Sequence, residues 1–207
     1  STPSNSSAAS DVYKRQILAD GVIGQMMEKV VLPEQRTRLT DEEVIARCPW
    51  ATTGRTHHRT PNIITSLELD PAEMEKRNIH LQKKYAEIEE NEVRFEELHC
   101  EDAEYLIVAF GSCARIAQKA MEMAREEGIK VGLLRPITLW PFPSKAIAAR
   151  AAQVKGILTV ELNAGQMVED VRLAVKCKVP VEHFGRLGGI VPDPDEVITA
   201  LKEKLIK

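Results

Sequence analysis

Apolar and helical patterns alternate regularly through the second half of the chain. Four short, nearly continuous apolar runs are typical of buried strands. They cover residues 105–110, 129–134, 156–160 and 179–184. Helical patterns lie between them, over residues 112–128, 144–154 and 165–177, and Asp193-Pro194 opens a last helix. This alternation predicts an α/β domain over residues 102–207: an open parallel sheet with right-handed crossovers and helices on both faces.

The first half of the chain is less regular. Residues 1–16 combine a Ser/Ala/Thr tract with "DVYKRQ", and we expect them to be disordered or foreign to the fold. Thr40-Asp41-Glu42-Glu43 is a capping box that opens a short helix, which Pro49 ends. Asp70-Pro71-Ala72-Glu73 is a stronger helix start, and the helix is expected over residues 71–91.

The predicted helix over residues 71–91 carries one narrow apolar stripe. Met74, Leu81 and Ile88 lie seven residues apart, and Asn78 and Tyr85 occupy the other seam position of a heptad. The other faces are mostly charged. The pattern favours a helical linker arm that lies across a surface over a helix within a core.

Charge and cysteine spacing exclude several classes of function. The net charge of −3 gives no electrostatic reason to expect nucleic acid or an anionic membrane as a partner. No apolar run approaches the roughly 20 residues that span a bilayer. The cysteines form no C-x-x-C pair, so we expect reduced cytoplasmic thiols and no metal or cluster bound by this chain alone. They are Cys48, Cys100, Cys113 and Cys177.

Two loops at the carboxyl edge of the predicted sheet are candidate ligand or interface sites. Ser112 follows Gly111 at a helix start and can cap it, but the G-x-G-x-x-G spacing of a dinucleotide site is missing. Arg135 begins the proline-rich segment "RPITLWPFP". Trp140 and Phe142 in that segment either form an interface, because a stiff loop loses little entropy on docking, or fold back over the sheet edge.

"VELNAGQMV" is the third candidate at this edge. Glu161 and Asn163 could bind a ligand, or they could hydrogen-bond the backbone of neighbouring loops, with Asn163 making a turn before Gly165. His183, at the end of the next predicted strand, is the histidine expected nearest to them. These residues do not assemble a nucleophile, a base and an orienting group, so the sequence predicts no catalytic residue here.

Four segments, in this order and spacing, resemble one enzyme family. They are "ADGVIGQMMEKV", "TPNIITSLELDPAEMEKRNIHLQKKY", "LLRPITLWPFP" and "VELNAGQMVEDVR". From about Ile17 onward the chain is similar to the carboxyl-terminal half of the α subunit of 2-oxoacid:ferredoxin oxidoreductases, of the 2-oxoisovalerate type. The resemblance implies that residues 17–32 are a remnant of a pyrimidine-binding domain, 33–101 a linker, and 102–207 a transketolase carboxyl-terminal-like domain.

The resemblance also implies a function. Such enzymes decarboxylate a 2-oxo acid on thiamine diphosphate with magnesium. Iron–sulfur clusters then carry the electrons to ferredoxin, and coenzyme A accepts the acyl group. This chain would support the assembly and contact the β and γ or δ subunits, without binding a cofactor or turning over substrate alone. The substrate would be a 2-oxo acid of the branched-chain kind.

The linker supplies the substrate-side candidates. Many relatives read Thr-Gly-Leu-Glu-His-Asp where this chain has Thr65-Ser66-Leu67-Glu68-Leu69-Asp70. The resemblance therefore implies Asp70, with Glu68 and Thr65, as candidate polar groups near the substrate. Asp70 is equally explained as a helix cap.

Two other interpretations stay open. The chain could be the equivalent domain of another thiamine enzyme, such as a 2-oxoacid dehydrogenase β subunit or a transketolase. It could also be a free-standing module that binds a nucleotide or a protein at the same strand edge.

Overall fold

The protein divides into two compact units, residues 1–74 and 75–207. The computed structural model describes residues 18, 21–25, 27, 29, 31–32, 34–35, 37–48, 50 and 67–206. In the first unit, α2 spans Gly21–Gln25 and α3 spans Asp41–Arg47. The predicted capping box of α3 is confirmed, because the Glu43 amide donates to Thr40 Oγ1 (3.3 Å) and the Thr40 amide donates to Glu43 Oε2 (2.9 Å). The tract 1–16 lies outside the described residues.

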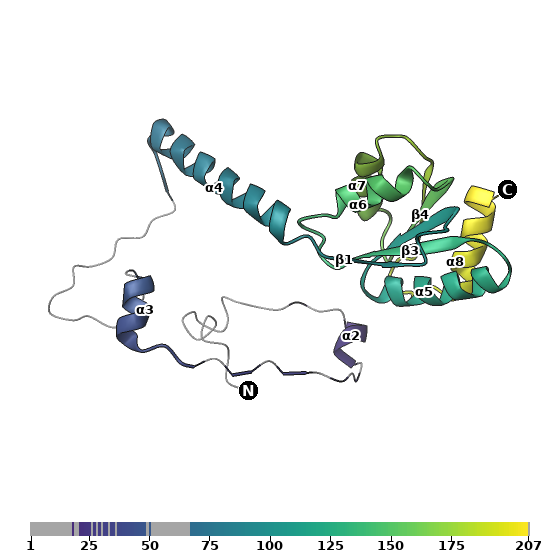
Figure 1. Cartoon of the computed structure of the whole chain (residues 1–207), viewed down its shortest axis with the longest axis horizontal. Helices are drawn as coiled ribbons and strands as arrows, with labels where there is room; N and C mark the ends of the chain where they lie inside the picture. The colour runs from purple at the N-terminus through teal and green to yellow at the C-terminus, as the bar shows by residue number, and fades with distance from the viewer. Residues whose placement is uncertain are drawn as a thin grey trace. The chain divides into compact units, whose positions relative to one another are not determined.

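The long helix α4 spans Pro71–Asn91, the bounds that the capping pattern predicted. Asp70 Oδ1 accepts hydrogen bonds from the amides of Ala72 (2.8 Å) and Glu73 (3.1 Å) and so caps the first turn. The structure describes all 21 residues of α4, and none of them is buried. The helix leads into β1 at the edge of the sheet (Figure 1).

The second unit is built on a five-stranded sheet in the order β1-β3-β2-β4-β5. Its strands are β1 (Phe95–Leu98), β2 (Tyr105–Ala109), β3 (Val131–Pro136), β4 (Gly156–Glu161) and β5 (Val181–Gly185). Strands β2 to β5 pair in parallel, as predicted. β1 pairs antiparallel with β3, with Phe95 opposite Pro136, so the sheet is mixed and extends into the range expected to be linker.

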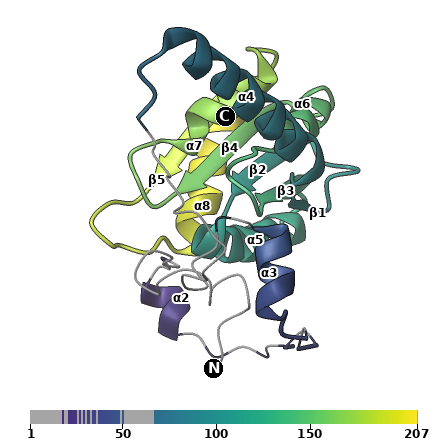
Figure 2. The same ribbon diagram turned by 90° about the vertical axis from the view of Figure 1, so that its left-hand side faces the viewer.

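Helices cover both faces of the sheet, as the sequence predicted (Figure 2). They are α5 (Gly111–Glu126), α6 (Ser144–Ala151), α7 (Met167–Val175), α8 (Pro194–Leu201) and the π-helical turn η2 (Lys202–Ile206). Ile107 of β2 packs into one core with residues of α5 and α8. Its neighbours Leu106 and Val108 pack into a second core with residues of α6 and α7. This period of two places adjacent strand residues on opposite faces.

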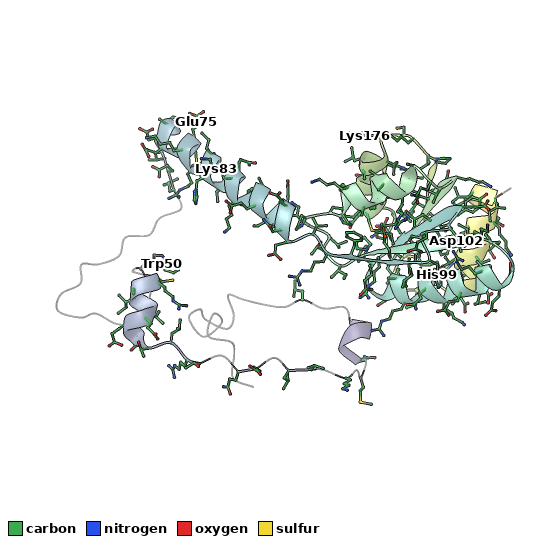
Figure 3. The ribbon with its side chains drawn as sticks, viewed as in Figure 1. Trp50, Glu75, Lys83, His99, Asp102 and Lys176 are labelled. Atoms are coloured by element: carbon green, nitrogen blue, oxygen red, sulfur yellow. The ribbon has the colours of Figure 1, made fainter. Side chains whose placement is uncertain are left out.

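One arginine joins the start of β2 to the start of β3. Arg125 of α5 donates from Nε to the Val131 carbonyl (2.8 Å), from Nη2 to the His99 carbonyl (3.0 Å), and to the carboxylate of Asp102. The hydrogen bond from Arg125 holds the pKa of Asp102 below its usual range. His99 and Asp102 lie at the same end of the sheet (Figure 3). These contacts hold together the end of the sheet at which the parallel strands begin.

Candidate functional site

The candidate site is the edge where parallel strands β2, β3, β4 and β5 end. Glu161 is the last residue of β4 and pairs with Gly185, the last residue of β5. Arg135 lies near the end of β3, and Ser112 lies just beyond β2. The sheet therefore brings the loops that follow all four strands to one edge, where open α/β sheets bind ligands.

Glu161 is buried at the first turn of α7. Its side chain is 0% exposed, although it carries a carboxylate. Oε2 accepts hydrogen bonds from the amides of Gln166 (3.2 Å) and Met167 (2.8 Å), and Oε1 accepts one from the Val168 amide (3.0 Å). These are the free N–H groups that begin a helix, and they carry partial positive charge. Glu161 therefore joins the end of β4 to the start of α7.

The turn between β4 and α7 is closed by Asn163. Its Oδ1 accepts a hydrogen bond from the Gly165 amide at 2.7 Å, which is an Asx turn. Gly165 has a φ of +112°, a conformation that residues with a Cβ rarely adopt. At Gly185 an added Cβ would lie 2.2 Å from the Asn163 carbonyl oxygen. The turn therefore requires glycine at both positions.

His183 lies beside Glu161 with both ring nitrogens near oxygen atoms. Nδ1 lies 3.4 Å from Glu161 Oε1 and 3.3 Å from Thr159 Oγ1, and Nε2 lies 3.3 Å from the Asn163 carbonyl. Thr159 Oγ1 donates to the Glu182 carbonyl (3.2 Å). The polar side-chain atoms of Glu161, His183 and Thr159 thus contact groups within one network. The arrangement can hold the edge in one geometry and does not present an activated nucleophile.

The prediction that Ser112 caps the helix after β2 is wrong. α5 begins one residue earlier, at Gly111, and its N-cap residue is Phe110, which makes no side-chain cap hydrogen bond. Gly111 takes a φ of +57°, and Ser112 lies inside the first turn of α5. The next residue, Cys113, is buried, and burial first and the carboxylate of Glu161 second raise its pKa to about 11.

In the proline-rich loop after β3, Phe142 takes the folded-back arrangement that the sequence left open, while an interface role of Trp140 stays a prediction. Trp140 is 56% exposed and packs edge-on against Tyr85 of α4, with ring centroids 5.7 Å apart. Phe142 folds back and packs against the core formed with α6 and α7. Arg135 donates from Nη1 to Glu96 Oε2 at 2.9 Å. Among the described residues, its Nε is one of two buried side-chain polar atoms without a hydrogen-bond partner, the other being Arg186 Nε.

A group of exposed apolar residues on the loops after β4 and β5 was not predicted. They are Leu162, Leu187, Ile190 and Val191. The Arg186 amide donates to the Glu161 carbonyl (3.3 Å), which places the two loops side by side. The apolar residues around the glycines of "GRLGGIVPDP" were the available sequence signal. Exposed apolar groups of this kind are one of the features by which protein-binding surfaces are recognised.

The linker candidates are only partly described. Asp70 is exposed and its Oδ1 is used in capping α4, while Glu68 is half-buried. Thr65 lies outside the described residues.

The described residues do not fit a metal ion or an iron–sulfur cluster. Within that part of the chain, no group of three or more His, Cys, Asp or Glu side chains is placed to hold a metal. Cys100 and Cys113 are buried in different cores. Among the described helices, none is long and apolar enough to cross a membrane.

Comparison with known proteins gives one consistent result. Residues 103–197 match the family described as pyruvate:ferredoxin oxidoreductase core domain II. The chain is 43% identical over 187 residues to ketoisovalerate oxidoreductase subunit VorB of Methanothermobacter marburgensis, covering 90% of this chain and 51% of that protein. It is 31% identical over 180 residues to 2-oxoglutarate synthase subunit KorA of Archaeoglobus fulgidus, covering 86% of this chain and 49% of that protein.

A solved structure supports the same relationship. The 2-oxoglutarate:ferredoxin oxidoreductase from Magnetococcus marinus, with 2-oxoglutarate, coenzyme A and succinyl-CoA bound, aligns with a TM-score of 0.58 and 25% identity. The alignment covers 66% of this chain and 24% of that chain. The chain spans about half the length of the curated relatives it matches. The resemblance found in the sequence is confirmed: the chain is a homologue of the VorB and KorA subunits of 2-oxoacid:ferredoxin oxidoreductases, and residues 103–197 belong to the core domain II family.

Proposed function

We propose that this chain is part of the α subunit of a thiamine diphosphate-dependent 2-oxoacid:ferredoxin oxidoreductase that acts on branched-chain 2-oxo acids. The observation that carries the proposal is the 43% identity to VorB over 90% of the chain. The complex oxidatively decarboxylates the oxo acid and delivers the acyl group to coenzyme A and the electrons to ferredoxin. We place it in the cytoplasm, where the four unpaired cysteines stay reduced.

In this proposal residues 102–207 act as a transketolase carboxyl-terminal-like domain that supports assembly. Residues 17–32 belong to a pyrimidine-binding domain, and residues 33–101 link the two and continue into β1. The network of Glu161, Asn163 and His183 supports this assembly role, because its polar atoms hydrogen-bond within the edge loops and hold them in place. Trp140 and the apolar residues beside Leu187 would contact the β and γ or δ subunits, since they are exposed on stiff or glycine-containing loops.

The cofactors are assigned to other parts of the complex. When bound there, thiamine diphosphate with magnesium supplies the decarboxylation chemistry, and the clusters supply electron transfer. This chain's own contribution is binding and orientation of neighbouring subunits. We assign Asp70 and Glu68, with Thr65, to the side of the complex that faces the substrate.

The test is co-expression of the chain with its missing α segment and with candidate β, γ and δ subunits. The purified complex is assayed for reduction of a viologen dye that depends on thiamine diphosphate, coenzyme A and a 2-oxo acid. A panel of straight-chain, branched and dicarboxylic oxo acids identifies the substrate. We expect turnover with 3-methyl-2-oxobutanoate and none when this chain is omitted.

Trp140→Ala tests the interface assignment in the same system. Loss of one buried aromatic contact typically weakens an interface by about 2 kcal/mol, roughly thirtyfold in affinity. Leu173→Ala, on an exposed residue of α7, is the matched control and should assemble normally. A chain that never associates with these subunits would instead favour the free-standing binding module.

A further inference from the structure

The apolar stripe of α4 is only partly covered in the part of the chain that the structure describes. All residues of α4 are exposed except Met74, Leu81 and Ile88, which are half-buried and seven residues apart. A 21-residue helix with no buried side chain gains little from tertiary packing, and single helices of such length are only marginally stable in water. A second surface is therefore needed to cover the stripe.

The residues between these positions indicate what that surface is. With Leu81 and Ile88 at heptad position d, Asn78 and Tyr85 fall at position a. A single asparagine at an a position favours two parallel helices in register, because the two amides hydrogen-bond to each other across the seam. Asn78 therefore favours pairing of α4 with an identical helix over pairing with an unrelated one.

The charges beside the seam are complementary in the same arrangement. Lys84 is at position g and Glu89 is at position e of the next heptad. In a parallel pair in register, Lys84 faces Glu89 of the partner subunit, and symmetry repeats the pair on the other side. At the amino end Glu75 would face Asp70, but Asp70 Oδ1 already accepts two amide hydrogen bonds of the first turn.

The seam continues onto the sheet unit. Tyr85 packs against Trp140, and the amides of Ile137 and Thr138 both donate to the Arg94 carbonyl, three residues beyond the end of α4. Ile137, Leu139 and Trp140 are each about half exposed. This apolar loop therefore lies beside the Tyr85 end of the seam.

We propose that α4 pairs with α4 of a second copy of this chain in a parallel, in-register two-stranded coiled coil, with Asn78, Leu81, Tyr85 and Ile88 in the seam. The pairing is a property of this chain and does not depend on the proposed enzymatic function. Its test is the association state of the chain, whereas the proposed function is tested by turnover of the complex.

Disulfide trapping of the full chain tests the register. In a background with Cys48→Ser and Cys177→Ser, Leu81→Cys places two thiols opposite each other at the d position. Lys83→Cys is the matched control, because the exposed Lys83 occupies position f, away from the proposed seam. Under mild oxidation we expect the Leu81→Cys dimer to form at least about tenfold faster, because only that pair meets disulfide geometry.

Sedimentation of charge variants tests the pairing independently of folding. Glu89→Lys should weaken the dimer, and Lys84→Glu combined with Glu89→Lys should restore it, because the swap recreates the cross-helix pair. Circular dichroism checks that each variant is folded. A chain that stays monomeric, equal trapping at positions 81 and 83, or a double variant no stronger than the single one would each overturn the proposal.

Discussion

At the scale of single residues, Glu161 has the most specific role at the carboxyl edge. A buried carboxylate is costly unless its oxygens are fully hydrogen-bonded, and here three backbone amides at the start of α7, including that of its N-cap residue, and the ring of His183 face it. The negative charge of the carboxylate also interacts favourably with the partial positive charge at the amino end of the helix. The residue thus stabilises the α7 start and orients the Asn163 turn together.

We expect Glu161→Gln to lower the free energy of unfolding by about 1–3 kcal/mol, because an amide offers one acceptor oxygen where the carboxylate offers two. Urea unfolding followed by circular dichroism measures the change. Glu169→Gln, on the exposed face of the same first turn, is the matched control and should stay within about 0.5 kcal/mol. Equal stability of the two variants would contradict the role given to Glu161.

Gly185 allows the backbone of the Asn163 turn to approach β5. An added Cβ would lie 2.2 Å from the Asn163 carbonyl oxygen and 2.6 Å from His183 Nε2. We expect Gly185→Ala to destabilise the sheet unit by about 1–3 kcal/mol through overpacking. Gly24→Ala, where an added Cβ meets nothing within 4 Å, should leave thermal unfolding unchanged. If both variants melt like the parent, the turn is looser than the structure indicates.

The sequence predicted some of these residue roles and missed others for a physical reason. Asp70 and the Thr40 capping box could be predicted, because a cap is a local interaction within four residues. Glu161 was recognised as a candidate, but its partners were left open, since they follow a turn whose path depends on Gly165 and Gly185. The position of Arg186 beside the end of β4 depends on strand order, which no local pattern carries.

At the scale of elements, β1 depends on side chains from elsewhere in the unit. Its sequence "FEEL" has neither the length nor the apolar run of a buried strand, so the sequence placed it in a linker. Glu97 binds Arg150 of α6 through two hydrogen bonds, of 3.0 and 2.6 Å, and Glu96 binds Arg135 of β3. The strand is therefore held by long-range pairs, which explains why a local pattern missed it while it predicted β2 to β5.

Removing the arginine partner should loosen this edge strand. Arg150→Leu leaves the mostly buried Glu97 carboxylate unpaired, and we expect a loss of about 1–3 kcal/mol in unfolding free energy. Hydrogen exchange should rise first at the amides of β1. Arg94→Leu is the control, since Arg94 and Glu92 are more than half exposed and such pairs contribute about 0–1 kcal/mol. Unchanged exchange in β1 would show that the bidentate pair is dispensable.

At the scale of the whole molecule, two of the four thiols report on the two cores. Cys100 and Cys113 are buried on opposite faces of the sheet, and burial is the main cause that raises each pKa to about 11. At pH 8 only about one thousandth of each is thiolate, the reactive form. Cys177 is exposed and Cys48 half-buried.

We therefore expect a chromogenic disulfide reagent at pH 8 to modify Cys177 and Cys48 in the native protein. Cys100 and Cys113 should react only after denaturation, and peptide mapping identifies the modified residues. Because the pKa of both buried thiols is raised, their reactivity should increase as the pH approaches 11. Rapid modification of Cys100 without unfolding would contradict the packing between β1, β2 and α6.

The antiparallel pairing of β1 with β3 also sets an order of events during synthesis. β1 leaves the ribosome before β2 and α5, yet its hydrogen-bonding partner is β3, and the arginine that holds Glu97 comes later still, on α6. The parallel pair β2–β3 can form while β1 is still unpaired. The end of α4 can thus be attached to the sheet only after β3 has been synthesised, and a nascent chain stalled before α6 still lacks the arginine that holds Glu97.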